Sequence, residues 1–467
     1  MKNLLLFALI CSLMCCSFGL QAQHATIDAE FKKASIDRLS EMMIERYVFP
    51  EVAEQTAKHL KKKLKNGDFD EVTDLEAFAE MLTSSVQEIN KDKHMRIRPI
   101  PARQAEMETP ERMIDDAIAQ LQDRREGVSG FKAVKKLDGN VGYLDIRYFA
   151  SMQEGAAVAD TYMKLLATSD AVIIDLRENG GGDPAMVQYL CSYFIRPGVH
   201  LNSLYFREGD VTNEFWTLNE IGGERMPDVP LFVLTSDYTF SGAEEFSYNM
   251  QTQKRAKLVG MTTGGGANPG GRMPINDLLF VFIPTGKAIN PITGTNWEGT
   301  GVIPDVATSG EEAYDQAVKL ATAAAEKYRN KYEEEARVLL GSMLSAIDEI
   351  EASDETTIAK MEAALKTKMK VGVSVNLIGE MDINMMGYEC MQTQKAKAAE
   401  AVLKVNTLLF PNSANTYDSY GEALANNGKL EQAVKSYQKA IEIAAENEDP
   451  NITLYKQGLE RVQQQMK

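Results

Sequence analysis

The chain has 467 residues, of which 44% are hydrophobic and 25% are charged, as in ordinary soluble globular proteins. This length exceeds what one domain usually needs, so we expect two or three domains. The formal net charge of −17 argues against nucleic acid or an anionic membrane surface as the general partner, and weakly favours basic substrates through long-range steering.

The first 22 residues are typical of an export signal. Lys2 precedes an apolar run from Leu4 to Leu13, and small and polar residues follow. The run is too short to span a bilayer. A buried N-terminal helix and a lipid anchor at Cys15 or Cys16 are the alternatives. We therefore predict an exported protein, periplasmic or associated with the cell envelope, without a transmembrane segment in the mature chain.

Residues 23–92 are predicted to form a helical N-terminal unit. Two stretches, 31–49 and 75–89, carry apolar residues three and four positions apart, which is the spacing of a helix with one buried face. The polar segment KNGDFDEVTD separates them as a loop.

Residues 93–310 have the pattern of an α/β domain. Short apolar runs rich in β-branched and aromatic residues alternate with helical stretches; the runs are NVGYLDIRYF, DAVIIDL, VPLFVLTS, AKLVGM and LLFVFIP. This alternation predicts right-handed crossovers and a largely parallel, buried sheet. The active site of such a sheet lies beyond the C-terminal ends of its strands.

The remainder of the chain is predicted to be helical. Residues 311–370 are a charge-rich helical linker, and residues 371–467 contain two related segments that begin at Gly387 and Gly421. These glycines are 34 residues apart, whereas the Ala-Val pairs at 401 and 433 are 32 apart, so the repeat is degenerate. This pattern resembles tetratricopeptide repeats, which are stacked antiparallel helix pairs. A plain helical bundle is the alternative. Either would bind a protein partner, mediate self-association or brace the sheet domain.

Cysteine and histidine usage gives no sign of a disulfide framework or a metal site. Cys191 and Cys390 fall in different predicted domains, and we expect both to be buried and unpaired. The four histidines are scattered, and neither HExxH nor CxxC is present. We therefore predict no metal and no cofactor.

The stretch LTSDYTFSGAEEFSYN, residues 234–249, places Ser241 between a buried strand and a helix. S-G-A-E is a capping box, in which Ser241 Oγ accepts from the amide of Glu244 and the Glu244 carboxylate accepts from the amide of Ser241. The free amides and the dipole at a helix N-terminus also favour developing negative charge. Ser241 is therefore a helix cap, a nucleophile, or both.

The stretch DLRENGGGDP, residues 175–184, joins another strand to a helix through three glycines. Glycines permit close backbone approach, and their amides could bind an oxyanion; a flexible turn is the alternative. A phosphate loop is excluded because no Gly-Lys-Ser/Thr follows. We expect Asp175 and Arg177 to pair and to fix this turn.

Four motifs in chain order resemble those of the tail-specific, or C-terminal-processing, serine peptidase family. They are DLRENGGG, YTFSGAEEF, KLVGMTTGGGANPGG and NWEGTGVIPD, and they span about 130 residues. The resemblance implies a crotonase-like catalytic domain that hydrolyses peptide bonds in peptide or protein substrates. It assigns Ser241 as the nucleophile, and the amides of Gly242, Gly181 and Gly182 to the oxyanion hole.

The sequence departs from that family's pattern in two places. Members with a Ser–Lys dyad carry a lysine in the loop that reads TTGGGAN here, where Gly264, Gly265 and Gly266 stand. The segment between about residues 100 and 140 also leaves no room for the PDZ domain of many relatives.

The tricorn-core-like branch of the family uses serine with histidine and a glutamate, and it has a D-x-H motif. This resemblance implies that His94 of KDKHMRIRP is the general base and that Glu298 of NWEGTGVIPD supports it. Imidazole is suited to accept a serine proton near neutral pH. Thr263 and Asn268 are expected to line the substrate cleft, with ordinary turn roles as the alternative. Trp297 either packs a substrate side chain or covers the core.

These features predict an exported serine peptidase with His94, Ser241 and Glu298 at its site. Two alternatives stay open. One is a lipid- or retinoid-carrying scaffold built on the same sheet domain. The other is an esterase or amidase that uses the same serine.

Overall fold

The structure is a computed structural model that describes residues 27–100, 113–115, 117–119, 121 and 129–467. The predicted export signal lies outside the described residues. The chain divides into one unit that ends at Tyr328 and a second from Arg329 to Lys467. The predicted boundaries at 310 and 370 stay predictions. Among the described helices, none combines the length and apolar character needed to cross a bilayer.

Three helices form the N-terminal part of the first unit: α1 (Ala29–Arg46), α2 (Pro50–Lys65) and α3 (Leu75–Asn90). The side chains of Asp28 and Asp74 accept hydrogen bonds from backbone amides in the first turns of α1 and α3. Pro50 begins α2, where its missing amide hydrogen is not needed. The residues 31–49 and 75–89, predicted to be helical, are therefore confirmed as mainly helical.

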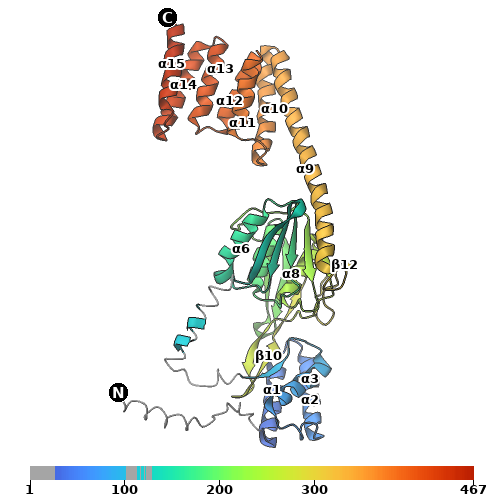
Figure 1. The fold of residues 1–467 in the computed structure, drawn as a ribbon. Coiled ribbons are helices and arrows are strands. Elements are labelled where there is room, and N and C mark those ends of the chain that lie inside the picture. The colour runs from blue at the N-terminus through green and yellow to red at the C-terminus, as the bar shows by residue number, and fades with distance from the viewer. Residues whose placement is uncertain (1–26, 101–112, 116, 120, 122–128) are drawn as a thin grey trace, which may run out of the picture. The chain divides into compact units, whose positions relative to one another are not determined.

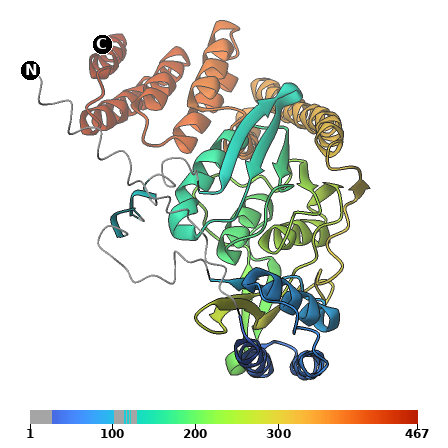
Figure 2. The same ribbon diagram turned by 60° about the horizontal axis from the view of Figure 1, so that its bottom comes forward.

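A small antiparallel sheet packs against these helices. Its strands are β1 (Ile97–Pro99), β10 (Leu279–Pro284) and β9 (Gly270–Pro274), in the order β1-β10-β9. The sheet lies beside the N-terminal helices in both views (Figure 1 and Figure 2). Ile97, Val281 and Ile283 from one face join the core of these helices. The prediction that LLFVFIP belongs to the parallel sheet is therefore wrong. The connection 275–278 between β9 and β10 is too short for a parallel crossover.

The main sheet is largely parallel, as predicted. Its strands are β2 (Phe131–Leu137), β3 (Val141–Ile146), β4 (Ala171–Asp175), β7 (Leu231–Thr235), β8 (Ala256–Gly260) and β12 (Val306–Ala307). They lie in the order β12-β8-β7-β4-β3-β2, and only the β2–β3 pair is antiparallel. Asp175 pairs with Leu234, and Thr235 pairs with Gly260, so three strands end at one edge.

Helices cover both faces of this sheet. On one face lie α6 (Met152–Leu166), α7 (Pro184–Phe194) and α8 (Gly242–Thr252), and on the other lies the first part of α9 (Ala313–Ala352) (Figure 1). Successive side chains of β4 point to opposite faces of the sheet: Val172 and Ile174 pack against α6 to α8, while Ala171 and Ile173 pack against α9. Ala313, Ala317, Ala321 and Ala325 recur every fourth residue, which lets α9 approach closely.

A third, antiparallel sheet completes the first unit and was not predicted. It comprises β11 (Gly286–Ile289), β5 (His200–Phe206) and β6 (Val211–Trp216), in that order, and the 3-10 helix η2 (Glu208–Asp210) lies between β5 and β6. The 3-10 helix η1 (Asp138–Asn140) lies between β2 and β3 of the main sheet. Cys191 on α7 is buried and unpaired, as is Cys390 in the second unit, which confirms the cysteine prediction.

The second unit contains the end of α9 and six further helices. They are α10 (Glu355–Ser374), α11 (Glu380–Gln392), α12 (Ala396–Leu409), α13 (Ala414–Asn426), α14 (Leu430–Glu446) and α15 (Ile452–Gln465). Helices α11 to α15 each pack against the next. Gly387 lies against Leu403, and Gly421 lies against Tyr437, so both glycines leave space for a side chain of the following helix.

Candidate active site

Ser241 lies in a sharp turn between the C-terminal end of β7 and the first residue of α8. Its backbone has φ 53° and ψ −120°, a conformation that residues with a side chain rarely adopt. Such a conformation costs about 1–3 kcal/mol and persists only where the surroundings hold it. A strained strand-to-helix turn of this kind keeps a serine side chain exposed above the strand ends.

The Glu244 carboxylate holds this turn. Glu244 is fully buried and accepts hydrogen bonds from the amides of Ser241 at 2.9 Å, Gly265 at 2.6 Å and Gly266 at 2.8 Å, and from the Thr263 hydroxyl at 2.5 Å. Burial raises the pKa of Glu244, and the hydrogen bonds oppose that rise. The predicted capping box forms through Glu244, whereas the Ser241 side chain makes no capping hydrogen bond and stays available.

Two backbone amides beside Ser241 are free to bind an oxyanion. Neither the Gly182 amide nor the Gly242 amide has a hydrogen-bond partner within the described part of the chain, and a Cβ on Gly242 would lie 3.1 Å from Gly182 N. The assignment of Gly181 is corrected, because its amide already donates to Asn179 Oδ1 at 2.8 Å. Asn179 is fixed in turn by a hydrogen bond from its Nδ2 to the Ile146 carbonyl at 3.0 Å.

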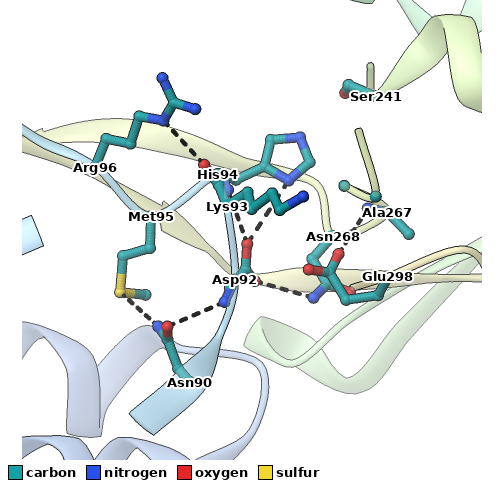
Figure 3. A network of polar contacts seen from close by, with 12 residues as sticks. Asn90, Asp92, Lys93, His94, Met95, Arg96, Ser241, Ala267, Asn268 and Glu298 are labelled. Carbon is teal, nitrogen blue, oxygen red and sulfur yellow. Dashed lines mark hydrogen bonds and ion pairs between the residues drawn. The ribbon is translucent and has the colours of Figure 1, made fainter. Parts of the chain in front are cut away.

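His94 lies between α3 and β1, and Asp92 orients it (Figure 3). Asp92 Oδ1 accepts from the His94 amide at 3.0 Å and lies 3.7 Å from His94 Nδ1. Asp92 Oδ2 accepts from Asn268 Nδ2 at 3.0 Å and from the Tyr47 hydroxyl at 3.3 Å. At 3.7 Å the ring contact is not a hydrogen bond, and His94 Nδ1 has no hydrogen-bond partner among the described residues. A proton on Nδ1 would face the carboxylate and leave Nε2 as the acceptor. We did not single out Asp92 from the sequence, although the D-x-H spacing contained the signal.

Aromatic rings fix the His94 side chain from two sides. Its ring centroid lies 4.5 Å from that of Phe240 and 5.6 Å from that of Phe282. A Cβ on Gly266 would lie 2.6 Å from His94 Cε1 and would overlap the Phe240 ring. The loop that carries a lysine in the dyad relatives is therefore glycine here, where these rings occupy the space that a side chain at Gly266 would need.

Glu298 is half-buried and lies close to Asp92 (Figure 3). Its Oε2 accepts from the Ala267 amide at 2.6 Å, while Oε1 has no partner in the described regions. Burial, and then repulsion from the Asp92 carboxylate, raises the pKa of Glu298 to about 8. Both causes favour the protonated form of Glu298.

Asp92, His94 and Glu298 could also be considered as ligands of a divalent cation. One ligand atom from each lies within 4.8 Å of the others. However, both oxygens of Asp92 already accept hydrogen bonds, from the His94 amide and from Asn268 and Tyr47. The arrangement is better suited to orienting an imidazole and holding a proton than to surrounding a cation.

Ser241 and His94 line one pocket of about 260 Å³, which we call the Ser241 pocket. The other lining residues are Gly182, Pro184, Leu204, Gly242, Glu245, Gly266, Ala267, Pro269, Gly270, Phe282 and Trp297. No hydrogen bond joins Ser241 to His94 among the described residues, and such contacts often form only once substrate is bound. Trp297 both lines the pocket and donates from Nε1 to the Gly266 carbonyl at 2.8 Å.

Two predicted cleft residues have other roles. Thr263 is buried, and its hydroxyl donates to Glu244 and accepts from the Val302 amide at 2.7 Å. Asn268 is also buried, and its side chain donates to Asp92. Neither lines the Ser241 pocket. The prediction that they bind substrate is corrected, because the Thr263 side chain bonds Glu244 and the Asn268 side chain bonds Asp92 outside the pocket lining.

Asp175 and Arg177 form the predicted pair, with Arg177 Nη2 donating to Asp175 Oδ2 at 2.7 Å.

Comparison with known proteins identifies related domains. Residues 140–308 match the model of peptidase family S41, and residues 29–131 match that of the N-terminal domain of peptidase S41 in eukaryotic IRBP. A carboxyl-terminal-processing protease of Synechocystis sp. is 28% identical over 160 residues, 32% of this chain and 32% of that protein. The chain thus spans about a third of the length of the curated relative that it matches.

Solved structures give similarities at low identity. A lipoprotein from Streptococcus agalactiae has a TM-score of 0.40 at 16% identity, over 63% of this chain and 96% of that one. The photosystem II D1 C-terminal processing protease has a TM-score of 0.38 at 14% identity, over 60% of this chain and 94% of that one.

Replacing Glu244 tests whether its carboxylate holds the turn. Glu244→Gln puts an amide NH2 among donors, so the free energy of unfolding should fall by about 3–5 kcal/mol. Urea unfolding measures it. Glu312→Gln is the control, because Glu312 also accepts from a serine three residues earlier but is exposed. It should cost no more than about 1 kcal/mol. Equal losses in the two variants would contradict the role of Glu244.

The raised pKa of Glu298 predicts a dependence of stability on pH. The pKa of Glu298 is about 8 in the folded state, whereas that of a glutamate in the unfolded chain is about 4.3. Stability from this group is therefore present at low pH and lost as pH rises toward 8. Tm measured from pH 5 to 9 should fall less in Glu298→Gln than in wild type. Parallel Tm curves for the two proteins would refute the assignment.

Proposed function

We propose that this chain, which carries the domains of peptidase family S41, is a serine peptidase with Ser241 as its nucleophile. The observation that supports it most is the convergence of three elements at one pocket. These are an unbonded serine side chain on a strained turn, the oriented imidazole of His94, and the free amides of Gly182 and Gly242. Nucleophile, base and oxyanion donors are the groups that acyl transfer needs.

The reaction follows from these positions. His94 Nε2 accepts the Ser241 hydroxyl proton while Oγ attacks the substrate carbonyl carbon, and the Gly182 and Gly242 amides hold the oxyanion. Asp92 stabilises the imidazolium that forms. Collapse breaks the peptide C–N bond as His94 donates its proton to the leaving amine. Water, deprotonated by His94, then hydrolyses the acyl-enzyme and restores Ser241.

Glu298 is assigned a supporting role in this scheme. Its carboxyl group fixes the Ala267 amide beside the pocket, and its protonated form avoids a second negative charge next to Asp92. We infer that Asp92 rather than Glu298 orients the imidazole, because Asp92 Oδ1 lies 3.7 Å from His94 Nδ1 and accepts from its amide.

Three finer features belong to the same proposal. The main sheet with α6 to α8 on one face supports a crotonase-like domain. The glycines 387 and 421 contact residues at the same offset, Leu403 and Tyr437, which supports tetratricopeptide-like repeats. Export to the periplasm or cell envelope rests on the apolar run from Leu4 to Leu13 alone.

Labelling with a fluorophosphonate tests the proposal. Wild type should label, Ser241→Ala should not, and His94→Ala should label at least about 100-fold more slowly because the hydroxyl loses its base. Ser247→Ala is the control, since Ser247 lies on the same helix but its hydroxyl bonds the Ala243 carbonyl. A folded wild type that does not label would support a carrier. Labelling with cleavage of esters or small amides but of no peptide in a library would support an esterase or amidase.

The glycine next to His94 provides a second test. Gly266→Ala puts a methyl group within 2.6 Å of His94 Cε1, so the ring must move. We expect labelling to slow at least about tenfold, as small displacements of a general base do. Gly271→Ala is the matched control, because a Cβ there has no neighbour within 4 Å. Equal labelling rates in both variants would show that the His94 position does not matter.

A further inference from the structure

A second, larger hollow of about 720 Å³ adjoins the Ser241 pocket, because His94 and Phe282 line both. Its cationic lining residues are Lys93, Arg96, Arg98 and Arg272, and all four are exposed. None of them forms an ion pair with a residue that the structure describes, and Asp237 is the one acidic residue of the lining. We call this hollow the basic groove. Four such cations stand out in a chain with a net charge of −17.

The sheet β1-β10-β9 builds the floor of the basic groove. Arg98 pairs across the strands with Phe280, and Arg272 pairs with Phe282. The Phe282 amide donates to the Arg96 carbonyl at 3.2 Å, so Arg96 lies next to the cross-strand pair of Arg272 and Phe282. Residues between these positions, such as Ile97 and Val281, point into the helical core. Strand alternation therefore puts the arginines and phenylalanines on the face that looks toward the candidate site.

The other contacts of these side chains leave their charges available. Lys93 Nζ donates to the Gly264 carbonyl at 2.6 Å, and Arg96 Nε donates to the Lys93 carbonyl at 3.1 Å. Figure 3 shows both residues on the segment that carries His94. The Arg272 guanidinium lies 5.4 Å from the centroid of the Phe280 ring. Carbonyl and ring contacts position a cation without neutralising it, whereas a carboxylate partner would.

We propose that the basic groove binds an acidic segment of the peptide substrate, so that the enzyme prefers substrates with carboxylates near the bond it cleaves. This inference rests on the proposed function for the identity of the ligand as a substrate. The groove supplies guanidinium groups for carboxylates and aromatic faces for the apolar parts of the same peptide. Its continuity with the Ser241 pocket at His94 favours a substrate segment over a separate partner.

Binding to Ser241→Ala tests the proposal without hydrolysis. Fluorescein-labelled peptides share an Ala-Val core and carry flanking glutamates, or glutamines at the same positions. Each is made with a free and with an amidated C-terminus. Fluorescence anisotropy at low salt should show about tenfold tighter binding of the glutamate peptide, because several exposed ion pairs each add a modest gain. The preference should shrink as salt is raised.

Variants then locate the site. Arg98→Gln and Arg272→Gln, each in the Ser241→Ala protein, should reduce the glutamate-to-glutamine affinity ratio about threefold. Arg38→Gln removes the same charge from the exposed face of helix α1 and should leave that ratio as it was. A ratio that falls equally in all three variants would show only long-range attraction and would overturn the groove.

The four peptides distinguish binding of glutamate side chains from binding of the C-terminal carboxylate. A preference that follows the side-chain glutamates supports the proposal. A preference that vanishes on C-terminal amidation and ignores the glutamates overturns it in favour of a chain terminus. Displacement of the glutamate peptide by a single-stranded oligonucleotide at lower concentration than by unlabelled peptide would also overturn it.

The two proposals fail separately. Wild type that labels with a fluorophosphonate while Ser241→Ala shows no glutamate preference would overturn the groove and leave the serine peptidase standing. Absence of labelling together with a glutamate preference lost in Arg98→Gln would overturn the peptidase and leave a site for acidic peptides.

Discussion

The buried Glu244 carboxylate is the interaction on which the candidate site depends. It accepts from the Ser241 amide on one side and from Thr263, Gly265 and Gly266 on the other, so it joins the turn after β7 to the loop after β8. These two loops supply the serine and the wall next to His94. A carboxylate taken out of water is costly unless donors surround it, and here four donors do. The same contacts hold Ser241 at φ 53°, a backbone conformation that a turn without such support would relax.

The position of His94, the proposed base, follows from the glycine loop. Glu244 draws the loop in through the amides of Gly265 and Gly266, and the rings of His94 and Phe240 fill the space where a side chain at 266 would stand. The proposed base, His94, therefore comes from the segment that leaves the N-terminal helices rather than from the loop itself. That segment is anchored because Met95 and Ile97, which follow the histidine in the chain, are buried in the helical core. The helical unit thus contributes directly to the geometry of the site.

The sequence predicted the site residues that directly follow the strands of the parallel sheet. Ser241, the glycine turn at 180–182 and the TTGGG loop each follow an apolar strand, and strands β4, β7 and β8 end at the same edge of a parallel sheet. Contacts between residues far apart in the chain have no comparable pattern in the sequence, so they were not predicted. Asn268 and Asp92 are 176 positions apart, and no local rule pairs them. Gly181 illustrates the same limit, because glycine spacing does not reveal that a neighbouring asparagine side chain already occupies its amide. The antiparallel strand β10 was misassigned because an apolar run looks alike in either kind of sheet.

Net charge and local charge point in opposite directions in this protein. A total of −17 weakly favours basic substrates, yet the surface beside His94 presents Lys93, Arg96, Arg98 and Arg272. At physiological salt the interaction between exposed charges decays over about 8 Å, so a peptide in the groove responds to these four residues more than to distant carboxylates. The acidic remainder of the chain acts mainly at longer range and at low salt. A bound acidic segment would thus gain its specificity from the face of one small sheet, whose opposite face is the apolar surface that attaches the N-terminal helices. The strand alternation that builds this core is therefore also what exposes the arginines to the site.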